Sequence, residues 1–194
     1  MDSILELDQI VFEWINQGWR LEWLDQIMPW WRNKTTWVPL YLIAVGILVW
    51  QYRRTTFFFL VAIGIAVGLA DFTSSQLIKK SVQRLRPCNE ISLDPPARRL
   101  VGCSKGYSFP SSHATNHFAL ATLLFLTWGR RWRKWRWLLF AWAASIALGQ
   151  VYVGVHYPLD VLGGTLLGTL IGAGVAYGYR QLSRLRIQAF YEQA

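Results

Sequence analysis

Long apolar stretches separated by short charged segments dominate the pattern of this chain. Nearly uncharged runs occur at residues 37–50, 57–70, 118–128, 137–155 and 161–179. Several approach the roughly 20 residues that a helix needs to cross a bilayer, once neutral flanking residues are counted. The pattern predicts an all-α, polytopic membrane helix bundle, with a soluble all-helical core as the alternative. Transmembrane helices, about five in number, are expected at residues 37–53, 55–79, 111–129, 136–155 and 158–179.

The segment before the first span, residues 1–36, has a different pattern. Apolar residues recur at helical spacing, but acidic side chains interrupt them, and a break is expected near Gln17-Gly18. We expect helices that lie in the membrane interface rather than cross it. The segment lacks the basic start and the cleavage site of a signal peptide, so it is expected to remain on the protein.

Tryptophans in and just after this segment fit an aromatic belt at a membrane surface. They are Trp19, Trp23, Trp30, Trp31 and Trp37. Such a belt anchors the chain or guides a lipid headgroup inward. We expect one domain over residues 1–194, with the interfacial helices at 1–36, the transmembrane bundle at 37–180 and a loop at 80–110.

The charge of the chain is basic and unevenly placed. Its 194 residues include 20 Lys and Arg against 11 Asp and Glu, a balance that would suggest a nucleic-acid partner in a soluble protein. Here the cations lie between apolar stretches, so we expect no nucleic acid and interpret them as topology signals. The positive-inside rule places Arg53-Arg54, 130–136 and 180–186 on the cytoplasmic side. Residues 79–113 and 154–160 then lie on the outer side, in a bacterium the periplasm, although the 79–113 loop is basic too.

Both cysteines of the chain, Cys88 and Cys103, lie in that outer loop. A disulfide persists in an oxidising compartment, so the two residues are a disulfide candidate, with two free thiols as the alternative. Two cysteines without further ligand spacing make a poor zinc site, and no metal is expected.

A histidine and a carboxylate flank the start of the last apolar stretch. His156 stands two residues before Pro158, which suits the first turn of a helix, and Asp160 falls within that turn. A histidine oriented by a carboxylate is a candidate nucleophile. The unpaired N–H groups at such a helix start attract phosphate.

Two further segments carry groups that suit phosphate. Lys79 and Arg86 are seven residues apart, which places both cations on one face of a helix that Pro87 stops. The sequence Pro110-Ser111-Ser112-His113 predicts another helix start, with serine hydroxyls as caps and a second histidine in the first turn.

These segments resemble the three motifs of a known family, the type 2 phosphatidic acid phosphatases (PAP2). The first motif, Lys-x6-Arg-Pro, is matched from Lys79 to Arg86-Pro87. The second, Pro-Ser-Gly-His, is matched except that Ser112 replaces glycine. The third, Ser-Arg-x5-His-x3-Asp, is matched at His156 and Asp160, but Gly149-Gln150 stands where Ser-Arg is expected.

The resemblance implies an integral membrane lipid phosphatase that works through a phosphohistidine, without a cofactor. His156 would attack phosphorus, Asp160 would orient its imidazole, and His113 would protonate the leaving group and then activate water. The implied phosphate-binding residues are Lys79, Arg86, Ser111, Ser112, Gln150 and Gly154. Family substrates are membrane lipids such as undecaprenyl diphosphate, phosphatidylglycerol phosphate, phosphatidic acid and the phosphates of lipid A.

Gln150 is the main departure from the family pattern. The loss of a guanidinium removes one positive charge and one bidentate contact from the expected phosphate site. Lys80, Arg84 or Lys105 could supply the missing charge. The alternative function is a noncatalytic phospholipid-binding or transport protein. The oligomeric state stays open.

Two further features concern the bundle itself. Asp71 lies within the second expected span on one helical face with Ser75 and Lys79, and should face the bundle interior. Glycines in two spans are expected to allow close helix packing. They are Gly64, Gly68, Gly163, Gly164, Gly168 and Gly172.

Overall fold

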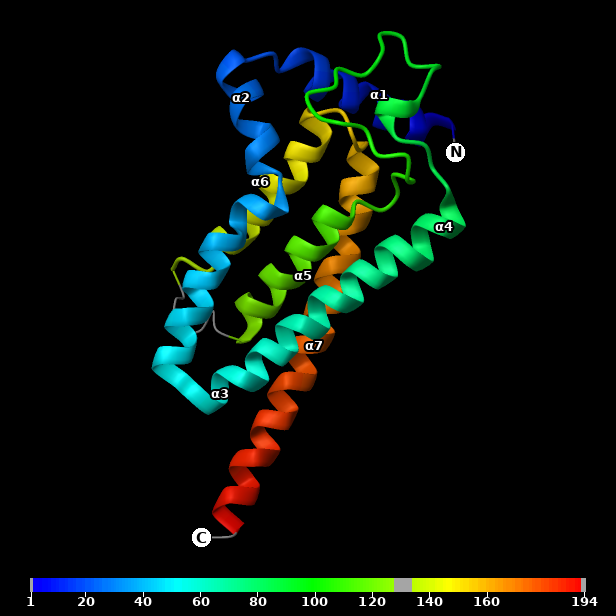
Figure 1. The fold of residues 1–194 in the computed structure, drawn as a ribbon. Helices are drawn as coiled ribbons and strands as arrows, with labels where there is room; N and C mark the ends of the chain where they lie inside the picture. Colours follow the sequence, from blue (N-terminus) through cyan, green and yellow to red (C-terminus); the bar gives the residue numbers. More distant parts are fainter. Residues whose placement is uncertain (1, 128–133, 193–194) are drawn as a thin grey trace.

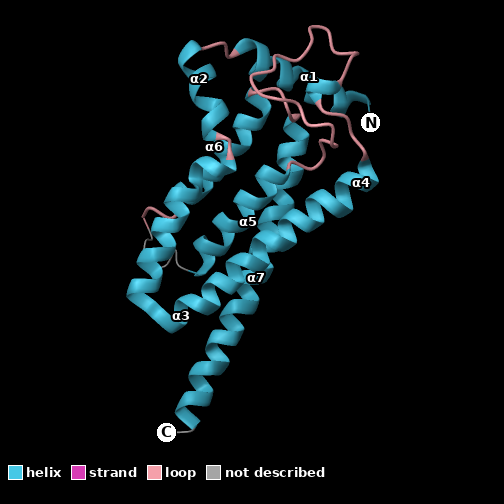
Figure 2. Ribbon diagram, viewed as in Figure 1, coloured by secondary structure: helices cyan, strands magenta, loops and turns pink. Residues whose placement is uncertain are grey.

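The chain forms an elongated bundle of helices (Figure 1). The structure, a computed structural model, describes the backbone of residues 2–127 and 134–192, and the side chains there except at residues 2, 51–55 and 184–192. Every regular element in this part is helical (Figure 2), as the sequence predicts. The α-helices are α1 (Asp2–Glu13), α2 (Glu22–Trp31), α3 (Val38–Phe72), α4 (Lys79–Val82), α5 (Ser112–Thr127), α6 (Leu138–Tyr152) and α7 (Pro158–Glu192). Shorter π or 3₁₀ turns are η1 (Trp14–Gly18), η2 (Lys34–Trp37), η3 (Thr73–Ile78) and η4 (Pro87–Asn89).

Helix α3 contains a sharp bend that separates two of the expected spans (Figure 1). The Thr56 hydroxyl donates to the Leu48 carbonyl at 2.7 Å, whereas eight residues of straight helix would separate the two positions by about 12 Å. The second limb continues through η3 into α4. Residues Thr56–Val82 and Pro158–Ser183 are long and apolar enough to cross a membrane.

The other expected spans are shorter helices. Lys34–Trp50 and Leu138–Tyr152 are apolar but fall below that length. Helices α5 and α6 have 16 and 15 residues, which gives lengths of about 24 and 22 Å against a hydrocarbon core of about 30 Å. The count of five transmembrane helices therefore stays a prediction.

Helices α5 and α7 pack closely because α7 presents glycines to α5. A side chain at Gly164 would come within 2.5 Å of the Ser111 carbonyl oxygen, and one at Gly168 would overlap the Thr115 carbonyl. Gly172 is equally confined by the Ala119 carbonyl, whereas Gly163 faces the Phe109 ring in the loop before α5. Close helix packing is thus confirmed for Gly164, Gly168 and Gly172, in line with small-residue interfaces. The prediction of close packing was wrong for Gly64 and Gly68, which have open space around them.

The N-terminal helices cover the end of the bundle where α7 begins (Figure 1). Their break falls after η1, where the sequence predicts it. Phe12 and Ile15 form a buried cluster with the segment that joins α6 to α7, including Val153, Val155 and Tyr157. This apolar packing holds α1 against the turn that contains His156.

Basic side chains mark the opposite end of the bundle. The Arg136 guanidinium lies 4.3 Å above the Phe125 ring, and Arg180 donates to the Leu126 carbonyl. Both contacts are at the C-terminal end of α5, about 18 Å along the helix from His113. Lys134 of the same groups is exposed, and the side chains of the remaining basic residues lie outside the described part. They are Arg53, Arg54, Arg130, Arg131, Arg133, Arg184 and Arg186.

Candidate active site

His156 lies in a tight turn between α6 and α7. Its backbone N–H donates to the Gln150 carbonyl at 3.3 Å, which closes the C-terminal end of α6. Helix α7 starts at Pro158, and Asp160 in its first turn accepts the Tyr157 N–H at 2.8 Å. The turn therefore fixes His156 and Asp160 relative to each other. Both side chains are buried.

Hydrogen bonding determines which nitrogen of His156 carries the proton. Arg86 Nη1 lies 3.1 Å from His156 Nε2, and a guanidinium only donates. Nε2 therefore accepts, and the hydrogen sits on Nδ1, which lies 3.4 Å from Asp160 Oδ2. Burial lowers the pKa of His156 to about 4, although Asp160 opposes the shift. The imidazole is neutral near pH 7, with a lone pair on Nε2.

The second oxygen of Asp160 belongs to an ion-pair chain. Arg84 donates to Asp160 Oδ1 at 3.0 Å and to Asp8 Oδ2 at 2.5 Å. Asp8, on α1, also accepts the Leu159 N–H at 2.8 Å. Burial raises the pKa of Asp8, and its contacts with Arg84 and Leu159 oppose the rise. Arg84 thus supports Asp160 and does not supply charge to the cavity.

Arg86 does not share a helix with Lys79, contrary to the expectation from their spacing. Helix α4 ends at Val82 because Gln83 adopts a left-handed conformation, with φ 54°. Arg86 is extended before Pro87, as a residue preceding proline prefers. Its Nε donates to the Gly106 carbonyl at 2.8 Å, and Nη1 donates to the Val155 carbonyl at 3.1 Å. The two cations nevertheless line the same cavity.

A π-helical turn, η3, precedes Lys79. Such turns occur frequently at functional sites because the extra residue redirects side chains. Ser74 and Ser75 of this turn lie 3.1 and 3.0 Å from the Ser112 hydroxyl. One turn earlier, Asp71 accepts the Asn116 amide at 3.3 Å. Asp71 is exposed and lines the cavity, so the expectation that it faces the bundle interior was wrong, although its polar face does meet α5.

The start of α5 offers backbone donors. The Ser111 N–H donates to the Asp160 carbonyl at 2.8 Å, and Ser111 is fully buried behind the cavity. Its hydroxyl accepts the Ala114 N–H at 3.5 Å. Among the described residues, no protein acceptor is recorded for the N–H groups of Ser112 and His113. These two groups are free to bind an anion.

A third histidine, His117, accompanies His113 on α5. The two rings are stacked with centroids 6.4 Å apart, and both line the cavity. The His117 Nδ1 donates to the His113 carbonyl at 2.7 Å, and its ring packs against Trp142. His117 lies outside the three motifs, so its place in the cavity was not predicted, although its i, i+4 spacing from His113 places it on the same helical face.

Of the two remaining expected phosphate-binding residues, Gln150 lines the cavity and Gly154 does not. The Gly154 N–H donates to the Val151 carbonyl at 3.0 Å. Its φ of 83° and its contact with the Arg98 carbonyl exclude a side chain, so its role is conformational. Gln150 is fully buried and lines the cavity. Its Oε1 has no hydrogen-bond partner among the described residues.

Cys88 and Cys103 form a bonded pair with Cα atoms 6.0 Å apart. The bridge closes the loop that begins directly after Arg86. Asn89 inside the loop donates to the Ser104 carbonyl at 2.9 Å. The loop that holds Arg86 against Gly106 is therefore tied together next to the cavity.

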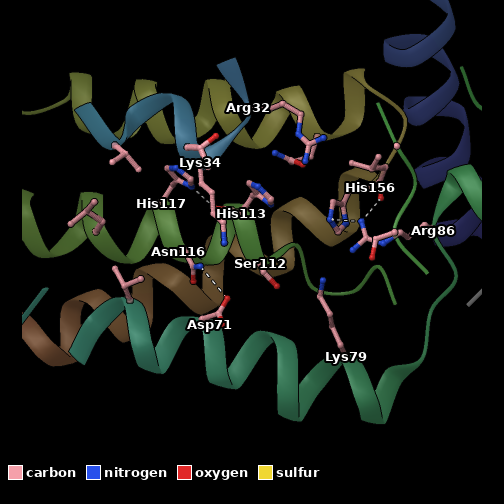
Figure 3. Close-up of a pocket in the computed structure, with 18 of the residues that line it drawn as sticks. Arg32, Lys34, Asp71, Lys79, Arg86, Ser112, His113, Asn116, His117 and His156 are labelled. Carbon is pink, nitrogen blue, oxygen red and sulfur yellow. Dashed lines mark hydrogen bonds between the residues drawn. The ribbon is translucent and has the colours of Figure 1, made fainter. Parts of the chain in front are cut away.

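These residues surround a cavity of about 550 Å³. Figure 3 shows Arg32, Arg86 and Lys79 reaching from separate elements toward the space beside His113 and His156. The Lys, Arg, Asp and His side chains that line the cavity are Arg32, Lys34, Asp71, Lys79, Arg86, His113, His117 and His156. Four Lys or Arg side chains face one carboxylate, so the cavity is strongly positive. Arg32 and Lys34 were not predicted from the sequence.

No group of three or more His, Cys, Asp or Glu side chains that could hold a metal ion is present among the described residues. A neutral, oriented histidine beside a second histidine and several unpaired cations defines a site suited to phosphoryl transfer.

Comparison with known proteins agrees with this class of site. The family model described as the PAP2 superfamily matches residues 55–184. The chain belongs to the PAP2 superfamily. The matched region contains every motif residue from Lys79 to Asp160.

Two relatives and one solved structure are similar to the chain. A lipid A 4'-phosphatase of Bacteroides thetaiotaomicron is 30% identical over 147 residues, which are 74% of this chain and 64% of that protein. An undecaprenyl-diphosphatase of Sulfolobus acidocaldarius is 32% identical over 136 residues, which are 70% of this chain and 59% of that protein. The chain thus spans about three fifths of each relative.

The structural match concerns the fold. A transmembrane PAP2-type phosphatidylglycerolphosphate phosphatase from Bacillus subtilis superposes with a TM-score of 0.70 and 21% identity, covering 93% of this chain and 88% of that one. The helical bundle is therefore the PAP2 fold, including the helices outside the matched motifs.

Proposed function

We propose that the protein is an integral membrane phosphatase that hydrolyses a lipid phosphate or diphosphate through a phosphohistidine. The observation that carries this proposal is His156. Its Nε2 holds a lone pair at the cavity wall, while Asp160 accepts from Nδ1. Simple phosphate binding needs no neutral histidine held in one tautomer by a buried carboxylate.

The first chemical step is attack by His156 Nε2 on phosphorus. A P–N bond forms as the bond between phosphorus and the leaving oxygen breaks, and His113 donates a proton to that oxygen. The imidazole gains positive charge, which Asp160 stabilises through Nδ1–H. Arg84 and the Tyr157 N–H hold Asp160 in place for this purpose.

The second step is hydrolysis. His113, now neutral, accepts a proton from water, which attacks phosphorus and breaks the P–N bond. Inorganic phosphate leaves and the neutral His156 is restored. A lipid hydroxyl that replaces this water would give transfer rather than hydrolysis.

Charge stabilisation comes from the unpaired cations. The nonbridging oxygens of a phosphate ester repel a nucleophile, so fixed donors must neutralise them. Lys79 and Arg86 make no ion pair with a carboxylate in the described part of the chain. The free N–H groups of Ser112 and His113 add donors at the start of α5.

The substrate class follows from the surroundings of the cavity. The bundle exposes many large apolar side chains, among them Leu69, Leu162, Leu166 and Leu170, as a surface in contact with lipid would. The relatives are named for lipid A phosphate and undecaprenyl diphosphate. The cavity therefore suits a phosphorylated headgroup whose acyl or prenyl tail stays in the bilayer.

The orientation of the site is also part of the proposal. The Cys88–Cys103 bridge belongs to an oxidising compartment. Arg136 and Arg180 lie at the other end of α5, on the side that the positive-inside rule makes cytoplasmic. Both features support an active site at the outer face of a cytoplasmic membrane.

The test is phosphate release by the detergent-purified protein from a panel of lipid phosphates and diphosphates, with EDTA present. Release that is unaffected by EDTA and lost in His156→Ala supports the phosphatase. Binding of the same lipids without any release would instead support the noncatalytic binder that Gln150 suggests.

A further inference from the structure

Arg32 is a cation in the cavity that the mechanism above does not use. It follows the last residue of α2, and its backbone N–H donates to the Met28 carbonyl at 3.1 Å. Its side chain lines the cavity (Figure 3). The Nε atom is buried and has no hydrogen-bond partner in the described part of the chain. A buried guanidinium donor without an acceptor carries a desolvation cost that a bound anion would remove.

The neighbours of Arg32 make that cost larger. No carboxylate pairs with it among the described residues. Burial lowers the pKa of Arg32, and the nearby positive charge of Arg86 lowers it further. Two neighbouring arginines without a carboxylate partner favour a negatively charged ligand between them.

The backbone of α6 leaves room for this arginine. A side-chain carbon at Gly149 would lie 3.3 Å from Arg32 Cβ and 3.5 Å from Met28 Sδ. Arg32 thus packs directly over the glycine that precedes Gln150. Serine at position 149, as in the family motif, would press on Arg32, and arginine at 150 would add a further cation to the cavity wall.

The turn that holds Arg32 is anchored to α6. Trp31 Nε1 donates to the Ser145 hydroxyl at 2.9 Å, and Trp37 Nε1 donates to the Trp31 carbonyl at 2.8 Å. The Trp37 ring also packs against Trp142 of α6, with centroids 5.6 Å apart. The segment is therefore fixed on the helix that carries Gln150 rather than resting loosely on the bundle.

We propose that Arg32 binds a phosphoryl oxygen of the substrate and takes the place of the arginine missing at position 150. Gly149 and Gln150 are then one coordinated change, because the glycine admits Arg32 and the neutral Gln150 avoids a second guanidinium beside it. This inference rests on the proposed phosphatase activity. It also makes the N-terminal segment part of the binding site.

The decisive experiment exchanges the charge between the two positions. In the full-length protein, Arg32→Gln should lower kcat/KM by about 10- to 100-fold, the effect of losing a hydrogen bond to a charged group. Arg32→Lys should recover only part of it, because lysine cannot form a bidentate contact. Gln150→Arg in the Arg32→Gln background should restore at least a tenth of the wild-type activity. Arg20→Gln, an exposed arginine of the same segment, is the matched control.

Binding of inorganic phosphate separates this inference from the proposed function. Its dissociation constant, measured by calorimetry, should rise in Arg32→Gln and fall again in the double variant, with melting temperatures near that of Arg20→Gln. If the wild type releases no phosphate, the phosphatase fails while phosphate affinity still decides the role of Arg32. Equal affinity and equal kcat/KM in Arg32→Gln and Arg20→Gln overturn the inference. If Arg32→Gln does not fold, the same comparison with Arg32→Lys decides.

Discussion

Arg84 joins Asp8 to Asp160, at 2.5 and 3.0 Å, across 76 residues of sequence on each side. The first helix of the chain is thereby connected to the carboxylate that orients His156. Asp8 also accepts the Leu159 N–H in the turn before Asp160. The N-terminal segment therefore stabilises the turn that contains His156 and Asp160 from outside the matched PAP2 region.

This connection predicts a positioning role for Asp8. Asp8→Asn should lower kcat by about 10- to 100-fold, because a small displacement of Asp160 misaligns His156. The KM should change little, since Asp8 does not line the cavity. Steady-state kinetics measure both, and Arg99→Gln, an exposed loop arginine, is the control. A kcat equal to that control would show that Asp160 keeps its place without Asp8.

His156 should remain neutral well below pH 7, with its proton on Nδ1. Because burial lowers its pKa to about 4, protonation occurs only near that pH. As pH falls, His156 in the unfolded chain binds a proton near its ordinary pKa of about 6.5, whereas in the folded protein it stays neutral until about pH 4. Its contribution to the free energy of unfolding therefore decreases as pH drops between these two values. Nitrogen-15 NMR of histidine-labelled protein reports both properties, and with three histidines in the chain, single substitutions assign the signals. A resonance of His156 that titrates near pH 6.5 would contradict this account.

The glycines of α7 predict a matched pair of stability effects. Gly168→Ala would force a methyl group against the Thr115 carbonyl and should destabilise the bundle by about 1–3 kcal/mol. Gly174→Ala, on the same helix with open space around it, should be neutral or slightly stabilising. Thermal unfolding in detergent compares the two variants. Equal melting temperatures would mean that α5 and α7 are not in close contact.

Reduction of the Cys88–Cys103 bridge should weaken the loop that holds Arg86. A cross-link closing a loop of this length, with a sequence separation of 15, stabilises it by about 3 kcal/mol in the chain-entropy model. The double variant Cys88→Ser, Cys103→Ser should therefore have a higher KM and a loop that proteases cleave faster. Treatment of that variant with dithiothreitol should have no further effect. Unchanged kinetics and proteolysis would show that the loop is held by its other contacts.

The relative placement of His156 and Asp160 could be predicted from the sequence because it depends on local spacing. The N–H groups in the first turn of a helix have no partner within the helix, so proline is well suited to that position. Pro158 therefore predicted the helix start, with His156 just before it and Asp160 in its first turn. The α7 glycines that contact α5 were also identified correctly. Gly64 and Gly68 were not, because a glycine alone does not show which helix lies against it.

The support of the site could not be predicted, since it depends on contacts distant in sequence. Asp8 is one of the acidic side chains that interrupt the N-terminal apolar pattern, and its partner Arg84 is one of three cations that the sequence offers as a source of the missing charge. Arg32 and Lys34 lie in a segment whose tryptophans indicated a membrane anchor. The positive φ of Gln83 ends the helix of Lys79 before Arg86. A left-handed glutamine cannot be predicted from the residue pattern, because residues other than glycine rarely adopt this conformation.

The most direct test of the account is to trap the phosphorylated enzyme. Wild-type protein is mixed with a phosphorus-32 labelled lipid phosphate that it hydrolyses, quenched with alkali within milliseconds and digested for mass spectrometry. The account predicts an acid-labile, alkali-stable phosphate on His156, which His156→Ala lacks together with all phosphate release. Continued release by His156→Ala, or a phosphate on another residue, would contradict the assignment of His156 as the nucleophile.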